Sequence, residues 1–220
     1  MINVLFAGDI VGSRGCDFAE DTVRRLKGKE KIDIVIVNGE NSADGNGITK
    51  RSMEQIFSFA DVITTGNHCF RRKEFTEYYD IKENLLRPAN YPDGVAGHGV
   101  CVLDMGAYSF AVVNLMGTAF MEPLNNPFEC IDRLLEDIHT PNIFVDFHAE
   151  ATSEKKAMGF YLAGKVSAVI GTHTHVQTAD EIILNDHTGY ITDAGMCGAE
   201  LSVLGVKLSL IHISEPTRLR

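Results

Sequence analysis

Short apolar runs alternate with more polar segments in the first third of the chain. The run at 32–37 is nearly all apolar and β-branched, as expected of a central strand that is covered on both faces. Similar runs at 2–7 and 61–65 predict strands before and after it, and helical segments are expected between them. This strand–helix–strand rhythm predicts a parallel α/β layer.

Three helices are predicted in the first 80 residues. The first spans 17–27, with Asp17 as its N-cap and Phe18 on its apolar face. The second begins after Thr49, whose hydroxyl is suited to cap it. The charged and aromatic segment 71–79 predicts a surface helix.

The second half of the chain predicts another sheet. Residues 99–105 and 108–115 are joined by a Gly-Ala turn and indicate a hairpin, which suggests that a second sheet begins there. Residues 128–138 form an amphipathic helical pattern with one acidic face. The remaining predicted elements are strands at 143–145, 166–170, 181–184 and 190–192, with a helix at 153–162. Since we find no internal repeat or linker, one domain is predicted over residues 1–207.

Five of the predicted strands are followed by side chains of the metal-ligand or acid–base type. In chain order these are Asp9, then Glu40 and Asn41, then Asn67 and His68, then His148, and finally His173 with His175. Ligands of parallel α/β sheets bind beyond the carboxyl ends of the strands, so one cleft could collect all of these groups. Their repetition at five strand ends favours one shared site over unrelated caps and core polar groups.

The chemistry of this set indicates a metal centre. His173 and His175 are spaced i and i+2, and extended backbone would point both imidazoles to the same side. A lone His-x-His is equally compatible with two neighbouring surface histidines, but the carboxylates and amides at the other strand ends favour metal binding. Mixed carboxylate, amide and imidazole ligands suit Mn, Fe or Zn better than Ca or Mg. A carboxylate that bridges two ions holds them about 3.5–4 Å apart, as two-metal hydrolases require.

Composition narrows the range of partners. The formal charge of −10 argues against broad, sequence-independent nucleic-acid binding, which needs a basic face. No apolar run approaches the roughly 20 residues that span a bilayer, and residues 1–6 show no cleavable signal pattern. The five cysteines are scattered and lack a Cys-x-x-Cys pair, which indicates reduced thiols. We therefore expect a cytoplasmic protein without a membrane partner.

Several ordered motifs in the chain carry a family resemblance. They are Gly-Asp-x-Val-Gly at 8–12, Asn-Gly-Glu-Asn at 38–41, Gly-Asn-His at 66–68, Arg-Pro-Ala-Asn at 87–90, Asp-Phe-His-Ala-Glu-Ala-Thr-Ser-Glu at 146–154 and Gly-Thr-His-Thr-His-Val-Gln-Thr-Ala-Asp at 171–180. Over residues 1–207 the sequence resembles the calcineurin-like metallophosphoesterases, and most closely their bacterial YmdB-type branch. The resemblance implies a four-layer α/β/β/α sandwich that carries two divalent metal ions, Fe or Mn in preference to Zn. It also implies a homo-oligomer.

The resemblance assigns a role to each strand-end residue. The first metal would be held by Asp9, Glu40 and His175. The second would be held by Glu40, as the bridge, with Asn67, His148 and His173. His68 would be the catalytic histidine, and Asn41 a polar partner of the site or of the phosphate.

Two positions depart from the wider superfamily, which has a histidine in place of Val11 and an aspartate in place of Glu40. Both departures are shared by the YmdB-type branch. The loss of one imidazole at Val11 implies a first metal that is more weakly held or more open.

Residues 208–220 continue no pattern of the chain and resemble the translation of a sequencing adapter fused to a shortened reading frame. We therefore leave them, with His212, out of the functional argument; a natural C-terminus is the alternative. Family members continue well beyond residue 207, so the resemblance implies a truncated chain whose second sheet lacks a strand and keeps an unpaired edge.

The leading hypothesis is a di-metal phosphodiesterase that hydrolyses small phosphodiesters by a metal-activated hydroxide, with His68 assisting. The resemblance favours 2′,3′-cyclic nucleotides. The sequence itself indicates only phosphoester hydrolysis, because none of its stretches specifies a base or a sugar. The alternatives are a phosphomonoesterase such as a nucleotidase, and a signalling protein that binds a nucleotide with little turnover.

Further polar positions are of lesser interest. Asp193 could orient a metal-bound histidine or cap a turn. Arg87 could neutralise a phosphate, although a structural role is favoured. The other histidines set aside as exposed or terminal are His98, His139 and His187.

Overall fold

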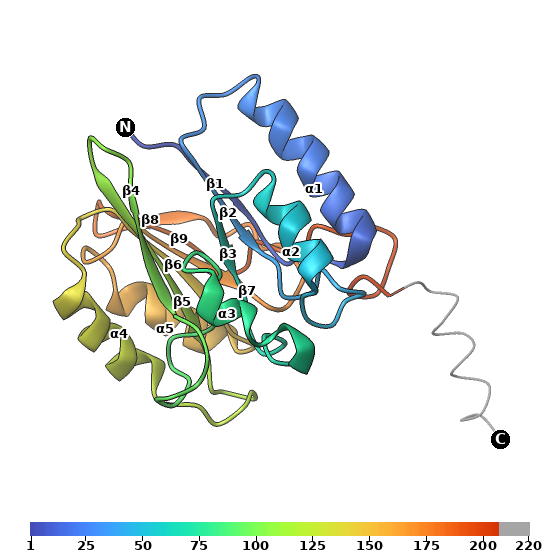
Figure 1. Ribbon diagram of the computed structural model, residues 1–220. Coiled ribbons are helices and arrows are strands. Elements are labelled where there is room, and N and C mark those ends of the chain that lie inside the picture. The colour runs from blue at the N-terminus through green and yellow to red at the C-terminus, as the bar shows by residue number, and fades with distance from the viewer. Residues whose placement is uncertain (207–220) are drawn as a thin grey trace.

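The computed structural model describes residues 1–206 and consists of two β-sheets packed face to face between two layers of helices (Figure 1). The first sheet has the order β1-β2-β3, and the second has the order β4-β5-β6-β7-β9-β8. The four-layer α/β/β/α prediction is therefore confirmed. The residues predicted to form the tail, 208–220, lie outside the described part of the chain.

The first sheet is parallel and formed by consecutive strands. Its elements are β1 (Val4–Ala7), α1 (Gly12–Lys27), β2 (Ile34–Asn38), α2 (Lys50–Phe57) and β3 (Val62–Thr64). Every residue of β2 is buried, because α1 and α2 cover one face of the sheet and the second sheet covers the other. This confirms the expectation of a central strand that is apolar on both faces.

The second sheet is mixed. Its elements are β4 (Val100–Asp104), β5 (Ser109–Met116), α4 (Pro127–Asp137), β6 (Ile143–His148), α5 (Thr152–Tyr161), β7 (Ala168–Thr172), β8 (Ile182–Leu184) and β9 (Thr188–Ile191). Strands β5, β6, β7 and β9 are parallel, whereas β4 and β8 are antiparallel edge strands. The predicted hairpin is confirmed as the β4–β5 pair.

Apolar side chains between the two sheets fix how the sheets stack. Ile36 of β2 packs in one cluster with Val112 of β5 and Phe144 of β6. The rings of Phe6 and Phe144 lie with their centroids 5.1 Å apart. This packing places the carboxyl ends of β1, β2 and β3 close to those of β6 and β7, and that edge carries the candidate site.

Two helix predictions are wrong in detail. Helix α1 begins at Gly12 with Val11 as its N-cap, and not at Asp17. Its buried face consists of small residues and one valine, while Phe18 is 61% exposed. At this early start of the helix, the amide of Val11 donates to the carbonyl of Cys197.

The predicted surface helix at 71–79 is instead two short helical segments, η1 (Lys73–Phe75) and α3 (Tyr78–Ile81). Phe75 and Tyr79 are almost fully buried in the apolar core that also contains Val23 of α1 and Met53 of α2. This segment therefore packs against the core and is not a solvent-exposed helix.

Helix α2 has the cap that was predicted. The hydroxyl of Thr49 accepts from the amide of Ser52 at 3.3 Å, and the hydroxyl of Ser52 accepts from the amide of Thr49 at 3.1 Å. We expect Thr49→Ala to lower the free energy of unfolding by about 1 kcal/mol, because it leaves a helix N-terminal amide without its acceptor. Urea unfolding followed by circular dichroism measures this change. Thr49→Ser keeps the hydroxyl and should be close to the wild type, and an equal loss in both variants would contradict the capping role.

None of the helices within residues 1–206 combines the length and apolarity needed to cross a bilayer.

Candidate metal centre

The candidate site lies where the carboxyl ends of strands from both sheets meet. The first sheet contributes residues that follow β1, β2 and β3, and the second contributes the last residue of β6 and the loop after β7. The structure brings together all eight residues singled out from the sequence: Asp9, Glu40, Asn41, Asn67, His68, His148, His173 and His175.

Close packing at this edge depends on a glycine after β3. A Cβ atom at Gly66 would lie 2.3 Å from Nε2 of His148 and 2.5 Å from Oε2 of Glu40. Any side chain at this position would therefore displace two of the proposed ligands. The Gly66-Asn67-His68 order thus has a steric reason in addition to a chemical one.

One half of the site is centred on Nε2 of His148. This atom lies 3.1 Å from Oε1 of Glu40, 3.1 Å from Oδ1 of Asn67 and 3.1 Å from Nδ1 of His173. Ligand atoms of Glu40, His148 and His173 all lie within 4.8 Å of one another, which is close enough to surround a single cation.

The other half is centred on the amide nitrogen of Asn41. Nδ2 of Asn41 lies 3.3 Å from Oδ1 of Asp9, 3.3 Å from Oε1 of Glu40 and 3.1 Å from Nε2 of His175. Two carboxylates and an imidazole therefore converge on one point, and Oε1 of Glu40 belongs to both halves of the site.

His68 borders the site without entering either half. Its Nδ1 is 2.8 Å from Oδ1 of Asn41, and its amide donates to Oε2 of Glu40 at 3.1 Å. Because an amide oxygen can only accept, Nδ1 of His68 carries the proton in this contact and Nε2 is left for another partner. Burial lowers the pKa of His68, so its neutral form is favoured near pH 7.

The pKa values of the buried groups at the site are shifted by burial and by their charged neighbours. Burial and the nearby Glu40 raise the pKa of Asp9. Glu40 is also buried, but the neighbouring His148 and His68 lower its pKa to about 2. Glu40 in turn raises the pKa of the buried His148 to about 9, so these two form an ion pair. Burial and His148 lower the pKa of His173 to about 4, which keeps that imidazole neutral.

The hydrogen bonds of the three histidines test whether this site suits a metal. Metal-bound histidines direct one ring nitrogen to the ion and the other to an oxygen acceptor. Here Nδ1 of His148 faces the hydroxyl of Thr172 at 2.9 Å, and that hydroxyl donates to Oδ1 of Asp146 at 2.7 Å. Because the hydroxyl proton is used on Asp146, Nδ1 of His148 is the donor and Nε2 is left as the inward-facing nitrogen.

The other two histidines follow the same arrangement. Nε2 of His173 lies 3.0 Å from the carboxylate of Glu150, and Nδ1 of His175 lies 3.3 Å from the carbonyl of Leu204. Their remaining ring nitrogens face His148 and Asn41, within the site. Each of the three imidazoles thus has one ring nitrogen bound outside the site and the other facing into it. Together with the buried carboxylates of Asp9 and Glu40, they form a donor set that fits divalent metal ions.

The backbone of the His-Thr-His segment differs from the prediction. Strand β7 ends at Thr172, and both His173 and His175 have positive φ angles, of 103° and 64°. The expectation that extended backbone aligns the two imidazoles is therefore wrong. They reach the site because the chain turns sharply after the strand.

Several supporting residues were not singled out from the sequence. They are Asp146 and Thr172 behind His148, Glu150 beside His173, and Lys155 beneath the His-Thr-His segment. Asp146 is fully buried inside a strand, between two apolar neighbours. A charged residue within an apolar run is unusual, so the sequence pattern could have indicated a role for it at the site.

Arg87 has the structural role that was favoured. Its guanidinium donates to the carbonyls of Pro88, Val95 and Ala96 and so holds the surrounding loop. The three histidines set aside, His98, His139 and His187, are all exposed.

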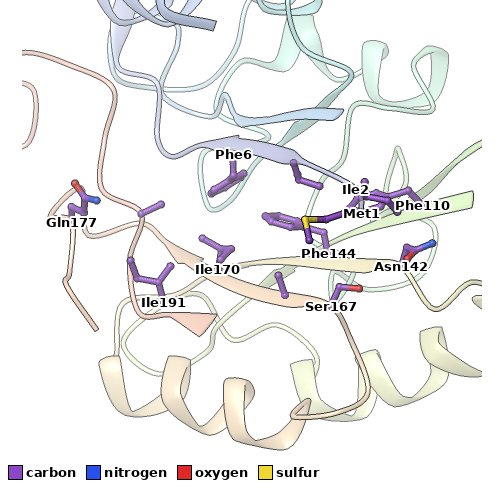
Figure 2. A pocket seen from close by; sticks show the side chains of 13 residues that line it. Met1, Ile2, Phe6, Phe110, Asn142, Phe144, Ser167, Ile170, Gln177 and Ile191 are labelled. Atoms are coloured by element: carbon purple, nitrogen blue, oxygen red, sulfur yellow. The ribbon is translucent and has the colours of Figure 1, made fainter. Parts of the chain in front are cut away.

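Two cavities have different relations to the site. A cavity of about 540 Å³ opens beside His175, between the start of α1 and residues 199–206. Another, of about 770 Å³, lies between β1 and the second sheet, where Phe6 faces Phe144 and Ile170 (Figure 2). The second cavity is lined by none of the proposed ligands, so only the first is placed to receive a substrate.

The chain is similar to known proteins over most of its length. Residues 5–216 match the family model described as YmdB-like protein. The chain is 48% identical over 208 residues to the 2′,3′-cyclic-nucleotide 2′-phosphodiesterase of Bacillus subtilis (strain 168), covering 93% of this chain and 79% of that protein.

Two solved structures share the fold over almost the whole chain. A hypothetical protein from Thermus thermophilus superposes with a TM-score of 0.91 at 39% identity, covering 99% of this chain and 85% of the other. A novel phosphatase from Mycoplasma pneumoniae superposes with a TM-score of 0.90 at 34% identity, covering 100% and 82%. The matched family model covers nearly all of the chain, and the chain therefore belongs to the YmdB-like protein family.

Proposed function

We propose that the protein is a di-metal phosphodiesterase that hydrolyses small phosphodiesters, with 2′,3′-cyclic nucleotides as the preferred class. The observation that carries this proposal is the convergence of ligand-type atoms on two adjacent points that share Oε1 of Glu40. The name of the Bacillus subtilis relative supports the substrate class.

The two halves of the site correspond to two ions. Asp9, Glu40 and His175 would hold the first, and Glu40 would bridge to a second held with Asn67, His148 and His173. The mixture of carboxylate, amide and imidazole ligands favours Fe or Mn, with Zn also compatible. Divalent ions held there would supply a Lewis acid for the phosphoryl oxygens and lower the pKa of a bridging water.

His68 is placed to handle the proton of the leaving group. Asn41 fixes its Nδ1 as a donor, so the unprotonated Nε2 of neutral His68 is the atom that can take a proton from the attacking water and pass it to the departing oxygen. During hydrolysis the oxygen of water forms a new bond to phosphorus, the bond to the ester oxygen breaks, and that oxygen leaves with a proton. His68 is the group beside the site that is suited to supply it.

The cavity beside His175 supports a small substrate. Its volume of about 540 Å³ lies in the range of roughly 300–1,000 Å³ that is usual for small-molecule sites. With a net charge of −10, the protein lacks the basic excess that binding extended nucleic acid requires. A single small nucleotide therefore fits better than a polymer.

The cytoplasmic location and the homo-oligomer stay predictions.

The test is hydrolysis by purified protein loaded with Mn²⁺. We expect turnover of bis-p-nitrophenyl phosphate and of 2′,3′-cyclic AMP, with cleavage at the 2′ oxygen giving the 3′-monophosphate in chromatography. Removing the metal with EDTA should abolish turnover, and adding Mn²⁺ back should restore it.

The same assay separates the alternatives. Faster turnover of p-nitrophenyl phosphate than of either diester would favour a phosphomonoesterase. Tight binding of a cyclic nucleotide with negligible turnover by folded, metal-loaded protein would favour a signalling role and reject the enzyme proposal.

A further inference from the structure

A buried ion pair beneath the site has no part in the proposed chemistry. Nζ of Lys155, in α5, lies 2.6 Å from Oδ2 of Asp193, which follows β9. Both side chains are only 1% exposed. Lysine is almost never fully buried unless it is paired, so this arrangement calls for a reason.

The ion pair holds the residue between two proposed ligands. Oδ2 of Asp193 accepts from the hydroxyl of Thr174 at 2.7 Å and from its amide at 3.1 Å. Oδ1 of Asp193 accepts from the amide of Gly195 at 2.8 Å, which fixes the carboxylate in the loop after β9. One carboxylate oxygen of Asp193 thus accepts two hydrogen bonds from Thr174. The ammonium group of Lys155 contacts the same oxygen and offsets its negative charge.

The backbone on both sides of Thr174 is in an unfavourable conformation. His173 has φ of 103° and His175 has φ of 64°, and residues with a Cβ atom rarely adopt positive φ. Such conformations persist only where surrounding contacts determine them. The amide of His173 donates to Asp9 at 3.0 Å, so Asp9 and Asp193 fix two successive amides of the turn.

The fold alone does not require these charges. Replacing a buried ion pair by apolar residues of similar volume is often neutral or stabilising, so packing gives little reason to retain Lys155 and Asp193. The contacts to Thr174 give a specific reason, because they determine where the two imidazoles point.

We propose that Lys155 and Asp193 are positioning residues, which clamp Thr174 so that His173 and His175 both face the metal centre. This inference rests on the proposed function, since it concerns the two histidines as ligands. Of the two roles considered for Asp193, the turn cap is present, because its Oδ1 accepts from the amide of Gly195. Its link to the two histidines runs through Thr174.

The first test compares two changes at Thr174. Thr174→Val keeps the volume but removes the hydroxyl that binds Asp193, whereas Thr174→Ser keeps the hydroxyl. We expect Thr174→Val to weaken Mn²⁺ binding by about 10- to 100-fold, as loss of an outer partner of a ligand typically does. Thr174→Ser should stay within about threefold of the wild type, because its hydroxyl is retained. Isothermal titration calorimetry with Mn²⁺ measures the affinity, and the d–d absorption of bound Co²⁺ reports the ligand geometry.

The second test removes the charges together. Lys155→Met with Asp193→Asn leaves no unpaired buried charge, so the metal-free variant should fold, as checked by its circular dichroism and unfolding midpoint. It should nevertheless bind Mn²⁺ more weakly and shift the Co²⁺ spectrum. If this double variant does not fold, the two Thr174 variants alone decide the outcome.

The outcomes separate this inference from the proposed function. Wild-type protein that binds Mn²⁺ and hydrolyses diesters, with Thr174→Val unchanged in affinity and in the Co²⁺ spectrum, would overturn the clamp and leave the enzyme assignment standing. Wild-type protein that binds no Mn²⁺ would overturn both. Weaker binding by Thr174→Val, with Thr174→Ser near the wild type, supports the clamp.

Discussion

Glu40→Gln is expected to remove both diester hydrolysis and the bound metal. Oε1 of Glu40 is the one atom shared by the two halves of the site, and a neutral amide bridges two cations poorly. Losing an outer partner of a ligand costs about 10- to 100-fold in affinity or activity, so loss of the bridge should exceed about 100-fold. Metal content by atomic emission and turnover of bis-p-nitrophenyl phosphate are the two measurements.

The fold should survive this change. In the metal-free protein, removal of the Glu40 charge takes away what raises the pKa of the buried His148, so that histidine loses its proton instead of remaining as an unpaired charge. Glu54→Gln is the matched control, because Glu54 forms only a solvent-exposed pair with Lys50. A folded Glu40→Gln protein that keeps both ions and near-normal turnover would show that the bridge is misassigned.

His68→Ala is expected to reduce turnover while leaving the metal content unchanged. His68 contacts Asn41 and Glu40 but lies outside both groups of ligand atoms. A proton donor in the transition state is worth about 10²- to 10⁴-fold, and we expect a loss of that size with 2′,3′-cyclic AMP, whose leaving oxygen is strongly basic.

The choice of substrate makes this prediction specific. Nitrophenolate leaves readily without a proton, so the loss with bis-p-nitrophenyl phosphate should be about tenfold or less. His98→Ala, at an exposed histidine, is the control and should match the wild type with both substrates. Equal losses with the two substrates would indicate that His68 steadies a phosphoryl oxygen and does not protonate the leaving group.

The layered fold could be predicted because its strands are apolar and short. The run at 32–37 corresponds to β2, and the hairpin that opens the second sheet is β4 with β5. The start of α1 could not be placed, because the helix buries small residues such as Gly15 and Ala19 that leave little trace in the hydrophobic pattern. The segment after β3 was misjudged because only the folded core shows that Phe75 and Tyr79 are inside.

The ligand-type residues of the candidate site could be predicted from the sequence, but the contacts that support them could not. The ligand-type residues follow strands directly, and strand ends of a parallel sheet must share an edge. The supporting contacts were not predictable, because they depend on which strands are neighbours. Asp146 meets Thr172 only because β6 pairs with β7, and Lys155 reaches Asp193 only because α5 covers this part of the sheet. The positive φ angles of the two histidines likewise arise from these tertiary contacts.

The division of the ligands between the two sheets affects the durability of the protein as well as its chemistry. Asp9, Glu40 and Asn67 follow strands of the first sheet, whereas His148 ends β6 of the second sheet and His173 and His175 follow its strand β7. Bound cations would therefore fasten the halves of the sandwich to each other. An ion present at 100 times its dissociation constant adds about 2.7 kcal/mol of resistance to unfolding. When divalent ions are scarce, the cell would then contain less folded protein as well as less enzyme activity.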